Sequence, residues 1–158
     1  MGRLGGFRES PSTSRAIDVK LLDVNVWLAA AWARHVHHVI AKRYVDVEDD
    51  DMVFCRVTEL AFLRLVTNRA VTGEDALTRR QAWDLLLALQ ADPRIKLVPE
   101  PRGLSPLWIA FSKRDDRSHL LWTDDYLAAF AQAMGAELVT LDAGLRARYP
   151  SVDVTQLR

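Results

Sequence analysis

The sequence predicts an α/β protein, a three-layer α/β/α sandwich built around a central parallel sheet. From Val19 onward, short apolar runs of strand length alternate with longer segments of helical period, which is the pattern of successive strand–helix–strand units. The chain has 158 residues, 49% hydrophobic and 27% charged, enough to bury one substantial core. We therefore expect residues 18–158 to form a single domain. Residues 1–17 are dominated by Gly, Ser, Pro and Arg and are expected to be a disordered N-terminal extension.

The predicted elements follow from this alternation, taken in chain order. Each strand is a short apolar run, and each helix is a longer segment whose apolar residues recur at three- and four-residue spacings. The strands are Val19 to Val24, Met52 to Phe54, Ile95 to Val98, Glu137 to Leu141 and Val152 to Val154. The helices are Val26 to Arg34, His37 to Asp46, Val57 to Thr67, Glu74 to Ala91, Leu104 to Arg114 and Asp124 to Met134.

Composition limits the functional classes that the sequence supports. Lys and Arg number 21 and Asp and Glu number 21, so no global positive field attracts a polyanion, although a local basic rim would still act at short range. The single cysteine, Cys55, excludes an intramolecular disulfide and a thiolate zinc cluster, which is typical of a reducing compartment. The chain has no apolar run of membrane-spanning length and no secretory h-region, so we expect a cytoplasmic protein without a membrane partner.

Two carboxylates are expected at the same edge of the sheet. The run VKLLDVNVWLAAAW reads as a buried strand that ends at Asp23, followed by a helix with Asn25 as its N-cap. The run AELVTLDAGL repeats this arrangement, with Thr140 two residues before Asp142. Ligands of open α/β sheets bind at the carboxyl ends of the strands. If the two strands are neighbours, the facing anions favour a cation between them, whereas each aspartate alone is explained by a turn before a helix.

Two further acids begin apolar helix faces. Glu59 is followed by Phe62, Leu63 and Val66, and Asp124 by leucine and alanines at the same helical spacings. For either acid the simpler interpretation is a favourable interaction with the helix N-terminus. The chain has none of the motifs GxxxxGK, GxGxxG, GxSxG or HExxH. One shared site is therefore the most economical explanation for four acids at the ends of helices and strands.

The order LLDVNVWL, TELAFLRL, TDDYLAAFA, LVTLDAGL resembles the PIN-domain ribonucleases, particularly the VapC toxins of bacterial type II toxin–antitoxin systems. The resemblance extends from about Val19 to the C-terminus, and the stretch ARHVHHVIAKRY is similar to that of a VapC subgroup. It implies a PIN-like α/β/α sandwich, commonly dimeric. It also implies an endoribonuclease that cleaves tRNA or rRNA, inhibits translation and growth, and binds a cognate VapB-type antitoxin.

The resemblance also assigns roles to residues. The acidic quartet corresponds to Asp23, Glu59, Asp124 and Asp142, and the polar supporting positions to Asn25, Thr58 and Thr140. Relatives commonly have a small residue after the third acid, where this chain has Asp125. Because Asp125 is followed on its own face by Ala129 and Gln132, we expect its side chain to face solvent and Asp124 to join the other acids.

Hard carboxylate oxygens select Mg²⁺, with Mn²⁺ as a substitute, over softer metals. Such an ion would orient the scissile phosphate, activate water and stabilise the charge that develops during in-line attack. Asp23, Asp142 and Asp124 are assigned to the metal, the first two in direct contact. Glu59 and Asp124 are expected to complete the coordination through water or to orient the attacking water.

Other residues have ordinary explanations that we prefer. The four histidines, at positions 35, 37, 38 and 119, are expected to cap helices or make core or subunit contacts rather than bind zinc, and the five tryptophans to pack rather than stack on bases. The five carboxylates between Asp46 and Asp51 fit a solvated turn, with a distal calcium site as the alternative. Basic side chains that could hold RNA phosphates are Arg56, Arg64, Arg69, Arg114 and Arg117.

Three competing functions remain open at this point. A PIN-like RNA-processing nuclease without an antitoxin would share the same acids. A carboxylate-based phosphatase or phosphoacceptor domain fits poorly, because Asp23 lacks both the DxD partner of the first and the adjacent acid pair of the second. A non-catalytic binding module is disfavoured by the intact acidic quartet.

Overall fold

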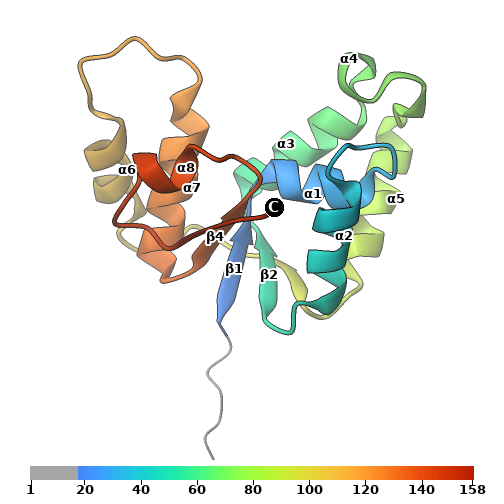
Figure 1. The fold of residues 1–158 in the computed structure, drawn as a ribbon, viewed down its shortest axis with the longest axis horizontal. Coiled ribbons are helices and arrows are strands. Elements are labelled where there is room, and N and C mark those ends of the chain that lie inside the picture. Colours follow the sequence, from blue (N-terminus) through green and yellow to red (C-terminus); the bar gives the residue numbers. More distant parts are fainter. Residues whose placement is uncertain (1–17) are drawn as a thin grey trace, which may run out of the picture.

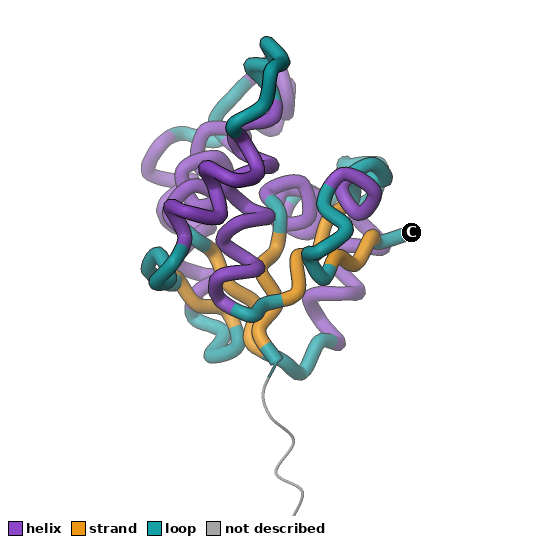
Figure 2. Tube along the Cα trace, turned by 90° about the vertical axis from the view of Figure 1, so that its left-hand side faces the viewer, coloured by secondary structure: helices purple, strands orange, loops and turns teal. Residues whose placement is uncertain are grey.

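The computed structural model describes residues 18–158, which form a parallel sheet with helices on both faces (Figure 1). The strand order is β3-β2-β1-β4-β5, and every neighbouring pair is parallel. The predicted α/β/α sandwich is confirmed, and Figure 2 shows the strands in the centre with helices on either side. The expectation for residues 1–17 lies outside the described residues. No helix among residues 18–158 is long and apolar enough to cross a membrane.

The strands are β1 (Val19–Leu22), β2 (Asp51–Phe54), β3 (Ile95–Leu97), β4 (Glu137–Thr140) and β5 (Val154–Gln156). The longer helices are α1 (Val24–Ala31), α2 (His38–Val47), α3 (Arg56–Val66), α5 (Arg79–Gln90), α6 (Leu104–Ser112) and α7 (Leu121–Met134). Short helical turns are α4 (Arg69–Thr72), η1 (Gly73–Asp75) and α8 (Leu145–Arg148).

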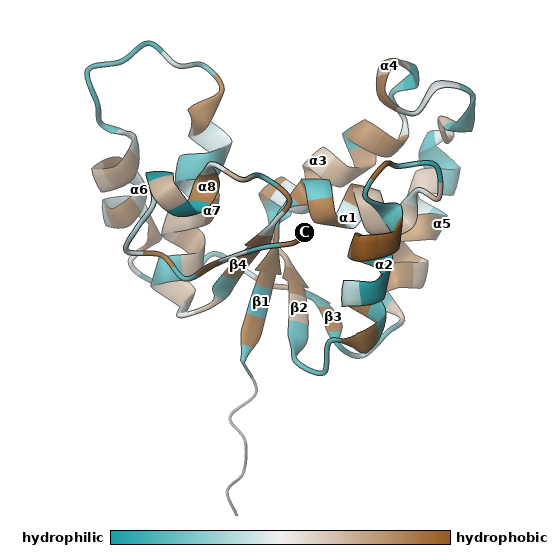
Figure 3. Ribbon diagram, viewed as in Figure 1, coloured by the Kyte–Doolittle hydropathy of each residue, from teal (hydrophilic) through white to brown (hydrophobic). Residues whose placement is uncertain are grey.

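The sheet divides the core into two halves because successive side chains of a strand point to opposite faces. In β1, Leu21 packs with α6, α7 and α8, whereas Leu22 packs with α1, α2, α3 and α5, and both leucines are completely buried. In the second half, the Trp27 and Phe54 rings stack with centroids 4.0 Å apart. The strands are accordingly apolar along most of their length (Figure 3).

Several predicted boundaries are wrong, among them those of the first helix, which is Val24–Ala31 rather than Val26 to Arg34. The segment expected to be helical from Glu74 to Ala91 is a 3₁₀ turn, a loop and then α5, because Thr78 and Gln81 form a reciprocal capping box that starts the helix at Arg79. The last long helix begins at Leu121, which places Asp124 in its first turn rather than at its start. The fifth strand is Val154–Gln156 rather than Val152 to Val154.

Strand order determines where a site can form. From β1 the chain proceeds outward to β2 and β3, then crosses back to β4 on the other side of β1 and on to β5. The order therefore reverses between β1 and β4, which makes the carboxyl ends of these two strands the topological switch point. In open α/β sheets this is where ligands bind.

Candidate active site

Asp23 directly follows β1 at the switch point, and its backbone N–H donates to Val139 O of β4 at 2.8 Å. The side chain is 7% exposed, and its Oδ2 accepts a hydrogen bond from the Thr140 hydroxyl at 2.9 Å. Thr140, the last residue of β4, is completely buried. The expectation that two neighbouring strands end together is confirmed, and Thr140 holds the carboxylate that ends β1.

Asp142 lies two residues beyond β4 and is tied to the same hydroxyl. Its backbone N–H donates to Thr140 Oγ1 at 3.0 Å, and its Oδ1 accepts from Gly144 N at 2.8 Å. Asn25 completes this group: its Nδ2 donates to Thr140 Oγ1 at 3.2 Å, and its Oδ1 accepts from Leu141 N at 3.1 Å. Asn25 therefore joins the first turn of α1 to the end of β4. It is not the N-cap expected from sequence, because α1 begins at Val24 with Asp23 in the N-cap position.

Asp124 approaches this group from α7. Its Oδ2 accepts a hydrogen bond from Arg148 Nη1 of α8 at 2.9 Å, in an ion pair whose side chains are 26% and 34% exposed. Arg148 also lies close to Asp142, since a Cβ atom placed on Gly144 would be 3.4 Å from both Arg148 Nη2 and Asp142 Oδ1. The guanidinium therefore pairs with Asp124, and Gly144 adjoins both Arg148 and Asp142.

The electrostatics indicate mutual repulsion among three aspartates. Burial raises the pKa of Asp124 to about 6, the charge of Asp23 is the next largest cause, and Asp142 adds to it, while Arg148 acts in the opposite direction. Burial also raises the pKa of Asp23, opposed by the Thr140 hydrogen bond and reinforced by Asp142. The ion pair with Arg148 is thus too weak to offset the rise in the pKa of Asp124 that burial and the two neighbouring anions cause.

Glu59 occupies a different environment. Its side chain lies in the first turn of α3 and is 5% exposed, and its Oε1 accepts from Arg56 Nη1 at 2.5 Å. Within residues 18–158, no hydrogen bond or ion pair connects Glu59 to the three aspartates. The adjacent Thr58 acts locally: its hydroxyl accepts from Cys55 N and donates to Cys55 O, each at 3.0 Å, which starts α3. Electrostatic coupling thus links Asp23, Asp124 and Asp142, while Glu59 lies on α3 and pairs with Arg56.

The expectation that Asp125 faces solvent is wrong. Asp125 is only 7% exposed, and its Oδ1 accepts from the Tyr149 hydroxyl at 2.5 Å. Helical spacing alone missed this because α8 and the residue that follows it cover this face of α7. Arg148 and Tyr149 were not predicted as site residues, and the sequence carries no signal for them because their partners lie 24 positions earlier.

The carboxylates suit a divalent cation by their chemistry. Their oxygens are hard donors, and burial together with neighbouring carboxylates raises the pKa of Asp23 and of Asp124. In residues 18–158, no three His, Cys, Asp or Glu side chains are already arranged closely enough to hold a metal ion. Arg148 pairs with Asp124 in this arrangement, so a bound cation would compete with the guanidinium for that carboxylate.

The structure agrees with some of the remaining predictions from sequence and differs from others. Trp27 and Trp108 pack inside, but Trp83 and Trp122 are 46% and 56% exposed, so the packing interpretation does not cover every tryptophan. His38 Nδ1 is hydrogen-bonded to Ala29 O at 2.8 Å, a local structural contact. Five arginines were predicted to hold RNA phosphates. Arg56 pairs with Glu59 and Arg69 with Glu74, and Arg64 lies on α3. Arg114 and Arg117 line a cleft beside Arg148.

Comparison with known proteins identifies the family. Residues 20–149 match the PIN domain. Ribonuclease VapC41 of Mycobacterium tuberculosis is 44% identical over 128 residues, which cover 77% of this chain and 88% of that protein. The crystal structure of M. tuberculosis VapC20, a sarcin-ricin loop cleaving toxin, gives a TM-score of 0.62 at 16% identity over 81% of this chain and 93% of its own. The crystal structure of VapBC2 from Rickettsia felis, bound to a DNA fragment from its promoter, gives a TM-score of 0.62 at 14% sequence identity. The match covers 89% of this chain and 99% of that one.

A parallel α/β/α sandwich with aspartates gathered at its switch point, together with this match over residues 20–149, defines a PIN-domain protein, and the chain belongs to that family. Its 44% identity to VapC41 groups it with the VapC ribonucleases. The resemblance based on the four sequence motifs is confirmed.

Proposed function

We propose that this protein is a metal-dependent endoribonuclease and the toxin of a type II toxin–antitoxin pair, cleaving tRNA or rRNA in the cytoplasm and thereby inhibiting translation and growth. The observation that carries the proposal is the convergence of Asp23, Asp124 and Asp142 at the switch point of a chain related to VapC ribonucleases. A VapB-type antitoxin is the proposed partner.

Asp23, Asp124 and Asp142 would hold Mg²⁺, or Mn²⁺ as a substitute. When bound, the ion would activate water and stabilise the charge that develops on the phosphate. The chain's own residues supply orientation: Thr140 holds Asp23 Oδ2 at 2.9 Å and the Asp142 backbone at 3.0 Å, so both carboxylates share one support. Glu59, buried beside Arg56, is proposed to orient the attacking water rather than bind the ion directly.

The proposal is tested with purified protein and an RNA substrate. Treatment with excess chelator should abolish cleavage, and Mg²⁺ or Mn²⁺ should restore it. Asp23→Asn should lower the cleavage rate at least a hundredfold, about 2.7 kcal/mol of barrier. Asp153→Asn, an exposed aspartate just before β5, is the matched control and should cleave normally. Undiminished cleavage in excess chelator would refute the metal-dependent mechanism.

The same variants test the toxin role in growing bacteria. Expression of the wild-type chain should arrest growth, and co-expression of the antitoxin encoded beside it should relieve the arrest. Asp23→Asn should be tolerated. Normal growth during confirmed expression of protein that cleaves RNA in vitro would instead identify an RNA-processing nuclease without an antitoxin.

A further inference from the structure

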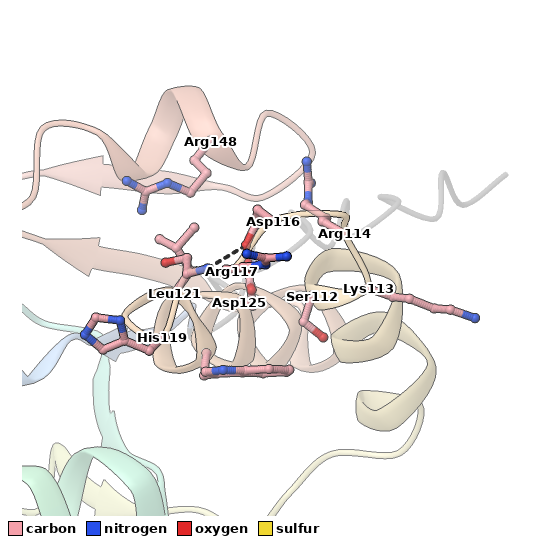
Figure 4. Close-up of a pocket in the computed structure, with 11 residues that line it drawn as sticks. Ser112, Lys113, Arg114, Asp116, Arg117, His119, Leu121, Asp125 and Arg148 are labelled. Atoms are coloured by element: carbon pink, nitrogen blue, oxygen red, sulfur yellow. Dashed lines mark hydrogen bonds between the residues drawn. The ribbon is translucent and has the colours of Figure 1, made fainter.

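A cleft of about 540 Å³ lies beside the aspartates, between the segment joining α6 to α7 and the residues of α8. Figure 4 shows Arg148 facing this segment across the cleft. Because Arg148 also donates to Asp124 at 2.9 Å, it connects the cleft directly to the carboxylate group. The cleft is lined by Ser112, Lys113, Arg114, Asp116, Arg117, Ser118, His119, Leu121, Trp122, Asp125 and Arg148.

The lining carries excess positive charge although the whole chain has none. Four Lys and Arg side chains face only two carboxylates there, and both carboxylates are already engaged. Asp116 Oδ1 accepts from Ser118 N at 2.9 Å, and Asp125 Oδ1 accepts from Tyr149. Among residues 18–158, neither Lys113 nor Arg117 forms a salt bridge. Lys113 and Arg117 are therefore available to an anionic ligand, whereas Arg148 is paired with Asp124 and Arg114 donates to Phe111 O.

An exposed aromatic ring completes the lining. Trp122 is 56% exposed at the start of α7, where no core packing requires a side chain of that size. Exposed aromatic rings beside Arg and Lys are the arrangement that binds single-stranded nucleic acid, with bases stacking on the ring and phosphates meeting the cations. The segment joining the two helices is predominantly hydrophilic, as Figure 3 shows, so an apolar protein partner fits it less well.

Two other clefts of the described chain lie away from the aspartates. The cleft between α3 and α5 is lined by Leu60, Leu63, Arg64, Thr67, Arg79, Ala82 and Trp83. The one near the end of α1 is lined by Ala31, Trp32, Val66, Thr72, Asp75, Leu77, Gln81 and Leu85. The first also carries basic side chains beside an exposed ring, but neither cleft is lined by Arg148 or by a residue of the aspartate group. Of these surfaces, only the cleft at α6 and α7 combines basic charge, an exposed ring and contact with Arg148.

We propose that this cleft binds single-stranded RNA on one side of the cleaved phosphate, with Arg117 contacting a phosphate and Trp122 stacking on a base. The proposal rests on the ribonuclease function proposed above and assigns residues for substrate binding to it. Arg148, between the cleft and Asp124, would contact the phosphate nearest the aspartates. The RNA must therefore present an unpaired segment at the cut site.

Binding is measured apart from cleavage, using Asp23→Asn protein in excess chelator and a short, fluorescently labelled single-stranded RNA. In that background, Arg117→Ala and Trp122→Ala should each raise Kd at least fivefold, and Trp122→Phe should restore most of the affinity. Arg117→Ala should also reduce the slope of log Kd against log salt by about one phosphate contact. Arg102→Ala, an exposed arginine at the opposite end of α6, is the matched control and should leave Kd unchanged.

Each result that contradicts the proposal shows which part of it is wrong. Equal loss of affinity in Arg102→Ala and Arg117→Ala would mean that only net charge matters, and equal binding of fully paired RNA would overturn the single-strand assignment. If the cleft variants bind RNA like the parent while the wild-type chain still cleaves with Mg²⁺, the cleft assignment is wrong and the ribonuclease function stands. If cleavage is absent but the cleft variants weaken binding, the ribonuclease proposal fails instead. Circular dichroism confirms that each variant is folded.

Discussion

Asp124 and Asp125 are adjacent on α7, yet their carboxylates lie in opposite surroundings. Asp124 faces Arg148 and the anionic group formed with Asp23 and Asp142, whereas Asp125 is buried against Tyr149. Two aspartates one residue apart on a helix point about 100° apart, so only one of them can join the site. We therefore propose a chemical role for Asp124 and a structural one for Asp125.

The size of the Asp124 contribution to stability depends on pH. Its folded-state pKa is about 6 against an ordinary 3.8, so between these values the folded protein binds more protons than the unfolded chain. Stability of the metal-free protein therefore falls as pH rises through about 4 to 6, and the penalty is fully present above that window. Asp124→Asn should raise the free energy of unfolding by on the order of 1–2 kcal/mol near pH 7.5, and the gain should vanish near pH 4. Urea unfolding in chelator at the two pH values measures it.

Asp125→Asn is the matched comparison on the same helix. It should lower stability by about 1 kcal/mol, because the Tyr149 hydroxyl then donates to a neutral acceptor, and should slow RNA cleavage less than about tenfold. Asp124→Asn should slow cleavage at least a hundredfold, about 2.7 kcal/mol of barrier. The reverse ranking of the two cleavage rates would make Asp125 the third acid.

At the scale of elements, Thr140 joins β1, β4 and α1 through one hydroxyl. That hydroxyl donates to Asp23 and accepts from Asn25 and from the Asp142 backbone. Thr140→Val keeps the volume but leaves three groups without this partner, so we expect a loss of about 1–3 kcal/mol in unfolding free energy and at least tenfold slower cleavage. Thr140→Ser keeps the hydroxyl and should retain most of both properties.

A second measurement separates positioning from general destabilisation. Cleavage is compared at a temperature where the valine and serine variants are both fully folded by circular dichroism. If the valine variant then cleaves at the wild-type rate, Thr140 supports the fold only and does not orient the carboxylates.

Much of this arrangement was predictable because it is local in sequence. An aspartate directly after an apolar strand, or two residues beyond one, lies at the end of that strand, so the positions of Asp23 and Asp142 could be predicted without the fold. Glu59 and Asp124 were identified by helical spacing together with the family resemblance. The start of α5 was missed because the capping box at Thr78 and Gln81 outweighed the helical period of the residues before it.

What sequence could not provide is the set of contacts between distant elements. The partnership of Arg148 with Asp124, and that of Tyr149 with Asp125, depend on how α8 packs against α7. Periodicity assigns a helix face to the core or to solvent, but here α8 and Tyr149 cover a face that the sequence marks as exposed. The same limit applies to the basic cleft, whose Arg117 and Arg148 come from segments that no local pattern connects.

On the scale of the whole molecule, α3 and α5 leave an apolar surface exposed. Leu60 and Trp83 line one cleft of about 350 Å³ and are 56% and 46% exposed, and Leu87, 58% exposed, lies one helical turn after Trp83. Large aromatic and aliphatic side chains gathered on one face are typical of subunit interfaces. This surface lies apart from the basic cleft, so pairing there would leave both RNA clefts open. We expect this chain to form a homodimer and to do so through this surface.

Leu60→Lys or Trp83→Lys should therefore convert the dimer to a monomer, because a two-fold interface places each substituted residue in the contact twice. Sedimentation velocity at micromolar concentration measures the change. Ile109→Lys is the matched control, since Ile109 is as exposed as Leu60, at 56%, but lies on α6, and it should leave the dimer intact. If the wild-type chain sediments as a monomer at every concentration, the dimer is excluded. If Ile109→Lys breaks the dimer and Leu60→Lys does not, the interface lies elsewhere. Retained RNA cleavage in a monomeric Leu60→Lys protein would further show that each subunit carries a complete site.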